Sequence, residues 1–259
     1  MLPRRSFNIS DLRPGAVGTL TGTDSMTLTE MVSTLGFDFL FTDCEHGDIS
    51  ERGLVSHVLA SEVPVFARLS DCAEVPVKLA ADAGVSAIVV PHVGSAQQAG
   101  RVVSWAKYAP AGLRSVGLSR NTLLGADLAH ALQCTDTPAV IAQIEDIDGV
   151  RNVEGICRTV GIDGVFIGPY DLSVSLGGPG DFECPKFTAA IGAVADSAHT
   201  AGISVGVYAP SVSAWHDFRR LGCDYVVLSA VSLFVVDGAR RVLSDARRHL
   251  VVNARTSAE

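Results

Sequence analysis

The sequence has few charges, few aromatic residues and no closely paired cysteines. Charged residues make up 19% and aromatic residues 6% of the chain, whereas hydrophobic residues make up 47%. The 6 cysteines are scattered and form no C-x-x-C pair, which argues against a zinc cluster and against a secreted disulfide scaffold. We therefore expect a large apolar core, with mostly buried thiols in a reducing cytoplasm.

Other absences exclude whole classes of function. No apolar run reaches the roughly 18 residues that a membrane-spanning helix needs, and no apolar segment follows the basic N-terminus as in a secretory signal. The formal net charge of -8 repels phosphate backbones, which argues against a nucleic-acid partner. The first expected strand is not followed by G-x-G-x-x-G, and there is no Walker loop, so a nucleotide site is disfavoured.

Short apolar runs alternate with helical patterns along nearly the whole chain. The expected strands cover 15–20, 37–42, 64–69, 87–91, 139–144, 164–167, 203–208 and 225–228. Apolar runs of this kind are typical of parallel strands that are buried on both faces. Eight of them with helices between predict an α/β fold, a (β/α)8 TIM barrel, although spacing alone leaves an open doubly wound sheet as the alternative. Without a linker or repeat, we expect one domain over 1–259, with an irregular lead-in over 1–14 and a helical tail over 231–259.

Two acidic residues follow neighbouring expected strands. Glu145 ends the strand over 139–144, and Asp171 follows the next strand after Gly168 and Pro169, which let the backbone approach a ligand. Parallel strands gather their C-terminal ends at one edge, where active sites form. Two carboxylates there suit a hard divalent cation. The structural alternatives are an exposed loop acid for Glu145 and a helix cap for Asp171.

Further polar residues follow the second and third expected strands. Asp43, Glu45 and His46 crowd the end of the second strand, where a carboxylate beside an imidazole suits proton transfer. Arg68 ends the third strand and suits a substrate carboxylate or an enolate oxygen, with a structural ion pair as its alternative role. Among the other histidines, His92 is the one that follows a strand end and could face a pocket.

Five ordered segments together resemble the HpcH/HpaI aldolase family of metal-dependent pyruvate aldolases, such as 4-hydroxy-2-oxoheptanedioate aldolase. They are GFDFLFTDCEHG, AADAGVSAIVVPHV, YAPAGLRSVG, IAQIE and GIDGVFIGPYDLSVSLG. The resemblance runs from about Gly15 to Tyr225 and implies a barrel of the phosphoenolpyruvate/pyruvate type. It also implies a homo-oligomer, usually a hexamer built as a trimer of dimers.

The resemblance assigns roles to single residues. It implies Mg2+, Mn2+ or Co2+ held by Glu145 and Asp171, catalytic His46 and Asp43, and a pyruvate-binding Arg68. It implies that Gln143, Gly168 and Pro169 also bind the substrate. It implies that Asp82, on the helix after the third strand, reaches the site of a neighbouring subunit.

These residues predict a lyase that cleaves a 4-hydroxy-2-oxo acid reversibly into pyruvate, or a close 2-oxo acid, and an aldehyde. Both partners are then small molecules. One alternative is a citrate synthase-like condensation of oxaloacetate with acetyl-CoA, for which the basic loop with Arg114 and Arg120 would suit an anionic partner. The other is a barrel that binds a 2-oxo acid without catalysis.

Overall fold

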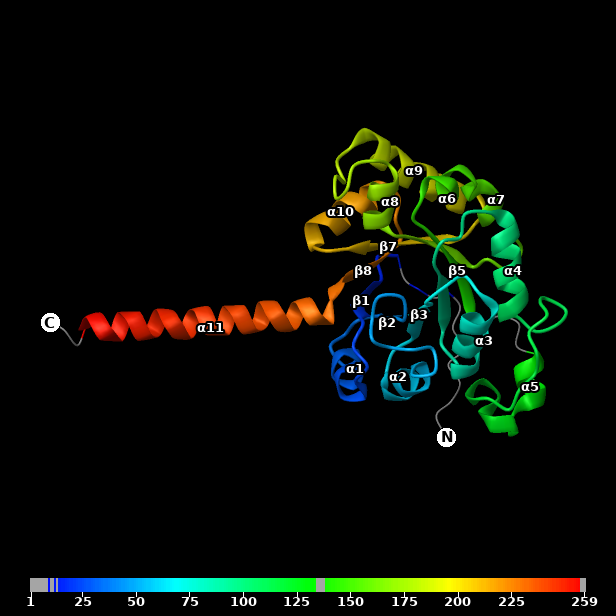
Figure 1. Cartoon of the computed structure of the whole chain (residues 1–259), viewed down its shortest axis with the longest axis horizontal. Helices are drawn as coiled ribbons and strands as arrows, with labels where there is room; N and C mark the ends of the chain where they lie inside the picture. The colour runs from blue at the N-terminus through cyan, green and yellow to red at the C-terminus, as the bar shows by residue number, and fades with distance from the viewer. Residues whose placement is uncertain (1–8, 10–11, 13, 134–137, 257–259) are drawn as a thin grey trace.

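The computed structural model describes residues 9, 12, 14–133 and 138–256, which form a closed barrel of parallel strands (Figure 1). Each strand pairs with the next, and β8 pairs with β1. The strands are β1 (Val17–Thr21), β2 (Phe39–Asp43), β3 (Val65–Arg68), β4 (Ala87–Val90), β5 (Ala139–Ile144), β6 (Gly164–Ile167), β7 (Ser204–Ala209) and β8 (Tyr225–Ala230). The predicted TIM barrel is confirmed, and the open sheet is excluded because the first and last strands are paired.

Helices follow the strands and cover the outside of the barrel. They are α1 (Met26–Ser33), α2 (Leu54–Ala60), α3 (Glu74–Ala83), α4 (Ala96–Ala106), the 3-10 helix η2 (Arg120–Gly125), α5 (Leu128–Gln133), α6 (Ile147–Arg151), α7 (Val153–Cys157), α8 (Pro169–Ser175), α9 (Pro185–Thr200), α10 (Val212–Arg220) and α11 (Val231–Thr256). The side chains of Ser25, Ser95 and Ser211 each accept a hydrogen bond from a backbone N–H in the first turn of α1, α4 and α10. These caps satisfy N–H groups that a helix start leaves free, so the serines fix where the three helices begin.

One expected helix is divided in two. The apolar pattern predicts a single helix over 149–160, but the chain forms α6 and α7, which meet at Asn152. The Asn152 side chain donates from Nδ2 to the backbone oxygen of Gly94 at 2.8 Å. Asparagine readily bonds to nearby backbone groups in place of continuing a helix. This bond ties the break to the loop that follows β4.

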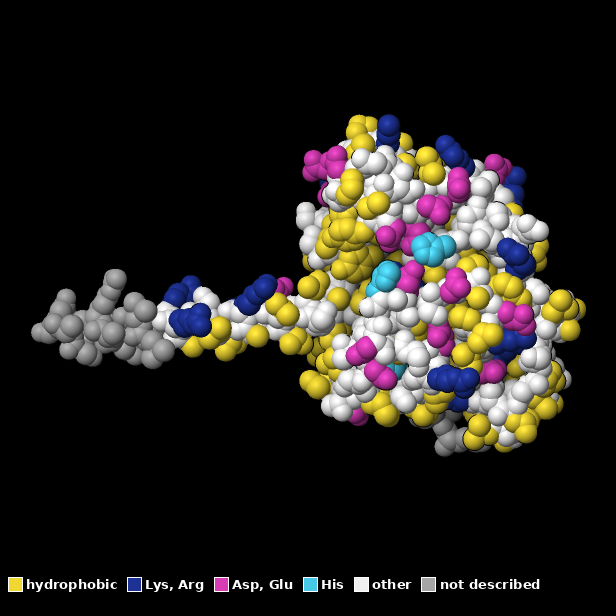
Figure 2. Space-filling model, in the orientation of Figure 1, with side chains coloured by type: hydrophobic (Ala, Val, Ile, Leu, Met, Phe, Trp, Pro, Cys, Tyr) yellow, Lys and Arg dark blue, Asp and Glu magenta, His cyan; other side chains and the backbone are white. Residues whose placement is uncertain are grey.

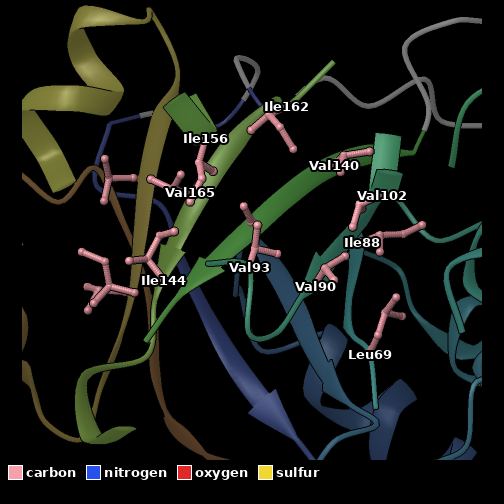
Figure 3. Close-up of a cluster of buried hydrophobic side chains, with 14 of the residues drawn as sticks. Leu69, Ile88, Val90, Val93, Val102, Val140, Ile144, Ile156, Ile162 and Val165 are labelled. Atoms are coloured by element: carbon pink, nitrogen blue, oxygen red, sulfur yellow. The ribbon is translucent and has the colours of Figure 1, made fainter. Parts of the chain in front are cut away.

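Successive residues along each strand face opposite sides of the barrel wall. One buried cluster lies inside the barrel and another lies between the strands and the helices. Figure 3 shows part of the outer cluster, where strand residues such as Ile88 and Val165 meet Val102 of α4 and Ile156 of α7. The inner cluster includes five rings, here called the aromatic plug: Phe39, Phe41, Phe66, Phe166 and Tyr225.

Two glycines leave space for rings of the aromatic plug. A Cβ atom at Gly18 would lie 2.4 Å from the ring of Phe39, and one at Gly206 would lie 2.2 Å from the ring of Tyr225. Phe39 stacks on Phe66 with ring centroids 4.4 Å apart, and Tyr225 meets Phe39 edge-on at 5.8 Å. The interior near the N-terminal ends of these strands is therefore filled by side chains, as in other packed barrels.

The helix α11 extends away from the barrel (Figure 1). It is the observed part of the tail expected over 231–259, whereas the lead-in expected over 1–14 lies mostly outside the described residues. Several large apolar side chains on this helix are exposed: Leu233, Phe234, Val235, Val236, Val242 and Leu243. Within the described part of the chain, no helix is both long and apolar enough to span a bilayer.

Candidate active site

Asp43 and Arg68 end two adjacent strands and form a bidentate ion pair at the barrel mouth, the end formed by the C-terminal ends of the strands. They are register partners in the pairing of β2 with β3, so the sheet itself places them side by side. Arg68 donates from Nε to Asp43 Oδ1 at 2.9 Å and from Nη2 to Oδ2 at 2.7 Å. Burial opposes the charged carboxylate, but the hydrogen bonds and charge of Arg68 outweigh it and lower the pKa of Asp43. The pair is therefore charged at neutral pH.

Asp43 also shapes the loop that follows β2. Its Oδ1 atom accepts hydrogen bonds from the backbone N–H groups of Glu45 at 3.0 Å and His46 at 3.3 Å. A Cβ atom at Gly47 would lie 2.3 Å from the backbone oxygen of Asp43, so the tight return of this loop requires glycine. The sequence predicts that Asp43 orients the imidazole of His46. The bond between them runs instead through the His46 backbone, and His46 is exposed.

Glu145 follows β5 as a buried carboxylate on the other side of the mouth. Its Oε1 atom accepts from the backbone N–H of His92 at 2.7 Å, and its Oε2 atom accepts from Nε2 of Gln143. A Cβ atom at Gly168 would lie 2.9 Å from Glu145 Oε2, so the loop after β6 approaches the carboxylate closely because it has glycine there. Glu145 is thus fixed by groups from three successive strand ends.

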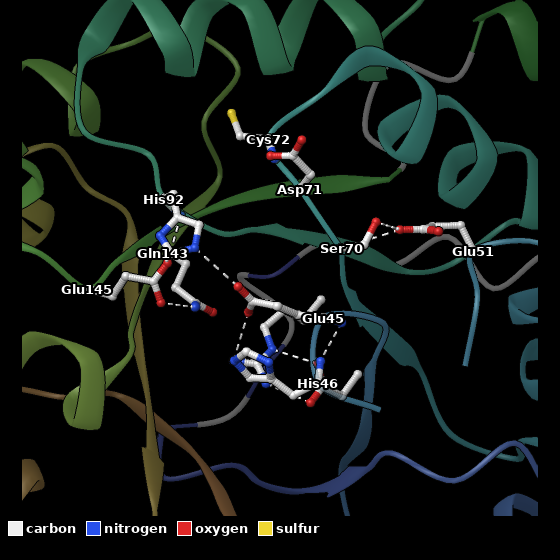
Figure 4. Close-up of polar contacts among 11 residues, drawn as sticks. Glu45, His46, Glu51, Ser70, Asp71, Cys72, His92, Gln143 and Glu145 are labelled. Carbon is white, nitrogen blue, oxygen red and sulfur yellow. Dashed lines mark hydrogen bonds and ion pairs between the residues drawn. The ribbon is translucent and has the colours of Figure 1, made fainter. Parts of the chain in front are cut away.

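His92 lies between Glu145 and Glu45 (Figure 4). Its Nδ1 atom is 2.9 Å from Glu145 Oε1 and its Nε2 atom is 3.3 Å from Glu45 Oε1. Burial and the charge of Glu145 raise the pKa of Glu45, although Arg68, with Nη1 at 3.2 Å from Glu45 Oε2, opposes the shift. Acidic and histidine side chains accordingly gather near the centre of this face of the molecule, beside a hydrophobic patch (Figure 2).

The donor set at the mouth fits a divalent cation. Glu45, His92 and Glu145 each offer a ligand atom, and these atoms lie within 4.8 Å of one another. Gln143, which bonds to Glu145, is fully buried, and within the described part of the chain its Oε1 atom has no hydrogen-bond partner. Two carboxylates, an imidazole and an unsatisfied amide oxygen are donors of the kinds that bind divalent ions.

Among the described residues, two that the sequence predicts for the site are not members of the group formed by Glu45, His92 and Glu145. Asp171 is exposed in the first turn of α8 and is not part of the group formed around Glu145. Asp82 pairs with Nη2 of the buried Arg114 near the end of α3. Because α3 runs back from the mouth toward the start of β4, Asp82 lies toward the opposite end of the barrel. Its expected action on a neighbouring subunit stays a prediction, as does metal binding by Asp171.

The fold and the polar residues at the strand ends define a TIM barrel with a candidate active site at its mouth, and comparison with known proteins supplies the family and the class of enzyme. The family model of HpcH/HpaI aldolase/citrate lyase matches residues 20–230. The chain belongs to this family. The expected family and the expected class of enzyme, a lyase, are therefore confirmed.

Named relatives cover most of the chain. A hydroxypyruvate/pyruvate aldolase from Chromohalobacter salexigens is 31% identical over 88% of this chain and 91% of its own. A 5-keto-4-deoxy-D-glucarate aldolase from Klebsiella pneumoniae is 32% identical over 84% of this chain and 86% of its own. A crystal structure of a family member from Burkholderia cenocepacia superposes with a TM-score of 0.85 at 29% identity, covering 91% of this chain and 95% of that one.

Proposed function

We propose that this protein cleaves a 4-hydroxy-2-oxo acid reversibly into pyruvate, or a close 2-oxo acid such as hydroxypyruvate, and an aldehyde. The observation that carries the proposal is the mouth itself, where the Arg68–Asp43 pair faces buried Glu145 across Glu45 and His92. The relatives named above, which are aldolases for pyruvate, hydroxypyruvate and a keto-deoxy sugar acid, support the same reaction class.

Arg68 suits the negative charge that develops during cleavage. Breaking the bond between C3 and C4 leaves an enolate on the 2-oxo acid fragment, and a fixed guanidinium stabilises such an oxygen without reorganising. Asp43 holds two of the Arg68 nitrogens in one plane, so the guanidinium has a single orientation. We assign the binding of the 2-oxo acid to Arg68, and its positioning to Asp43 and Gln143.

His46 suits proton transfer at the 4-hydroxyl group. Its backbone is anchored to Asp43 while the residue is exposed at the mouth, next to where an aldehyde would leave. In the cleavage direction the imidazole takes the hydroxyl proton as the C3–C4 bond breaks and the aldehyde carbonyl forms. In the condensation direction it returns that proton to the new alkoxide.

The proposal includes a divalent cation, Mg2+, Mn2+ or Co2+. Glu145 would hold it together with Glu45 and His92. Asp171 is the further ligand that the sequence predicts. When bound, the cation supplies a Lewis acid that polarises the 2-oxo group. A Schiff base with lysine is the other way to stabilise the same charge, but none of the eight described strands contains a lysine.

Chelation separates the two mechanisms. We expect EDTA to abolish the condensation of pyruvate or hydroxypyruvate with a panel of aldehydes, and a divalent ion to restore it. Treatment with borohydride in the presence of pyruvate should leave the chain mass unchanged. Activity that survives chelation together with a borohydride-trapped adduct would refute the proposal.

The loop arginines offer no support for the citrate synthase-like alternative. Arg114 is buried against Asp82 and over the ring of Tyr108, 4.6 Å from its centroid. Arg120 donates to the backbone oxygen of Ala83 at 3.4 Å. Both are thus engaged near the end of α3, away from the mouth. Product analysis with oxaloacetate, with and without acetyl-CoA, tests this alternative directly.

A binding barrel without catalysis would not need His46 beside the Arg68–Asp43 pair, and the same aldehyde panel separates it from an enzyme. We also propose the small-molecule partners and the homo-oligomer that the family resemblance implies. The exposed apolar side chains of α11, such as Phe234 and Val242, support association between subunits. Sedimentation of the full chain measures the assembly.

A further inference from the structure

His57 is a fully buried histidine, and both of its ring nitrogens have partners. It lies on α2 with no exposed surface. Its Nε2 atom is 3.1 Å from Oδ1 of Asp24, and its Nδ1 atom is 2.8 Å from Oγ1 of Thr29 on α1. A carboxylate oxygen only accepts, so Nε2 carries a proton, whereas the Thr29 hydroxyl can accept from Nδ1 or donate to it. The imidazole is therefore held in one orientation in either protonation state.

Packing alone does not account for an imidazole at this position. Burial of a polar ring costs free energy unless its nitrogens are bonded, and an apolar side chain would fill the same space between α1 and α2 without that cost. The two bonds of His57 instead tie α2 to the segment 24–29, which comprises the first turn of α1 and the end of the loop before it.

Asp24 connects His57 to the loop that follows β2. It lies in the loop between β1 and α1, and its backbone N–H donates to Oδ1 of Asp48 at 2.5 Å. The backbone N–H of Asp48 donates in turn to the backbone oxygen of Gly22 at 2.9 Å. A Cβ atom at Gly47 would lie 2.7 Å from that same oxygen, so the two loops are in direct contact. His57 thus fixes the loop after β1, and that loop holds the loop after β2.

The loop after β2 is the segment that carries His46. Asp48 comes two residues after His46, and Oδ1 of Asp43 accepts from the backbone N–H of His46 at 3.3 Å. Further along the same loop, Glu51 accepts from the backbone N–H of Ser70 at 3.0 Å, in the loop after β3. Because the His46 residue is exposed, the direction of its ring depends on how firmly this backbone is held.

We propose that His57 is a positioning residue for His46, acting through Asp24 and Asp48. The inference rests on the proposed function, in which His46 moves the proton of the 4-hydroxyl group, and it adds a residue that touches neither the substrate nor the reacting atoms. A misplacement of about 1 Å at a reacting group costs on the order of 100-fold in rate, so a loosened loop should slow the proton transfer. Binding of the 2-oxo acid depends on Arg68 and should not change.

Two matched pairs of variants test the proposal in the full chain. His57→Leu removes both ring nitrogens, whereas His57→Gln keeps an N–H group within reach of Asp24. Asp48→Ala removes the carboxylate that accepts the Asp24 N–H, and Asp48→Asn keeps an acceptor oxygen there. Because Asp48 is exposed, its variants decide the question even if His57→Leu does not fold. The control is His199→Leu, which breaks a histidine–aspartate pair at the opposite end of the barrel.

Two reactions that form the same enolate separate positioning from a general loss of structure. Aldol cleavage removes a hydroxyl proton as the C3–C4 bond breaks. Decarboxylation of oxaloacetate breaks the corresponding bond with loss of CO2, and the enolate then takes a proton from solvent, so no hydroxyl proton has to be removed. We expect kcat for aldol cleavage to fall on the order of 10–100-fold in His57→Leu and Asp48→Ala. In both variants, KM for the 2-oxo acid and kcat for decarboxylation should stay within about twofold of the wild type.

The conservative variants and the control should behave differently. His57→Gln and Asp48→Asn should recover most of the aldol rate, because each keeps the bond that its partner variant loses, and His199→Leu should match the wild type. Hydrogen–deuterium exchange measures the loop itself. The backbone amides of 44–53 should exchange faster in His57→Leu and Asp48→Ala than in the wild type. Unchanged exchange in both variants, or a parallel fall of aldol cleavage and decarboxylation, would overturn the proposal.

A failure of the proposed function gives a different result. If the wild type reacts with no member of the aldehyde panel, the proposed function fails, while faster exchange in His57→Leu would still show that this histidine holds the loop. If the wild type is an aldolase and both His57→Leu and Asp48→Ala cleave at its rate, only the positioning role fails.

Discussion

The two ends of the barrel interior use the same strands for opposite purposes. On β2, Phe41 belongs to the aromatic plug and Asp43, two residues on, belongs to the mouth. On β3 the same step leads from Phe66 to Arg68. Because side chains alternate along a strand, a step of two keeps the direction and changes only the chemistry. Packing and reactivity are therefore placed in separate layers of one barrel, and each layer can be perturbed alone.

Glu145→Gln should give the largest difference between the effect on activity and the effect on stability. The amide keeps the volume of the side chain and can still accept the His92 N–H, so the free energy of unfolding of the metal-free protein should change little. Loss of the carboxylate should lower kcat/KM for the aldol reaction about 10³-fold, or ~4 kcal/mol of transition-state stabilisation. Steady-state kinetics and urea denaturation measure the two quantities. Equal losses in both would show that the layers are not independent.

The converse variant is Tyr225→Ala in the aromatic plug. Truncating this fully buried ring should lower the free energy of unfolding by about 3–5 kcal/mol, because the cavity cannot close against a closed barrel. We expect KM for the 2-oxo acid to remain within about twofold at a temperature where the variant is folded. A large rise in KM without loss of stability would contradict the division into layers.

The stability that the Asp43–Arg68 pair contributes at the mouth should depend on pH. The pKa of Asp43 is lowered in the folded chain, so its pairing stabilises the fold above the unfolded pKa of about 3.9 and this contribution is lost as pH falls below that value. The stability difference between the wild type and Asp43→Asn should therefore shrink as pH is lowered through this range. Urea denaturation at several pH values measures it. A constant difference would show that Arg68 does not stabilise the carboxylate.

Among these variants, Tyr225→Phe should change the stability of the protein least. The Tyr225 hydroxyl is buried and has no hydrogen-bond partner among the residues that the structure describes, and burial raises its pKa, so it stays protonated. Removing it should leave stability unchanged or raise it by about 1 kcal/mol, since an unsatisfied buried polar group is lost. Thermal denaturation resolves a change of this size. A clear loss of stability would mean that this hydroxyl forms a bond in solution.

The strands and part of the site could be predicted from the sequence, because both depend on local patterns. Apolar runs placed the eight strands, and position at strand ends singled out Asp43, Arg68 and Glu145. For Glu45 the sequence shows only that it belongs to the polar segment after the second strand. The sequence indicates that His92 could face a pocket, but nothing in it fixes the left-handed turn that brings the ring to Glu145.

The positions of other predicted residues depend on loop geometry and on contacts between residues that are far apart in the chain. Asp171 lies in the exposed first turn of α8, which begins at Pro169, and metal binding by this residue stays a prediction. The pairing of Asp82 with Arg114 joins residues 32 positions apart through a loop whose path no local pattern specifies. Side-chain direction beyond a strand end follows from that path, so it could not be read from spacing.

The fit of Gly206 against Tyr225 has a consequence for how this sequence can change over time. A side chain at Gly206 would collide with the ring at 2.2 Å, and shrinking the ring alone would open a void. A larger residue at position 206 is therefore expected only together with a loss of the ring at position 225, as a compensated pair.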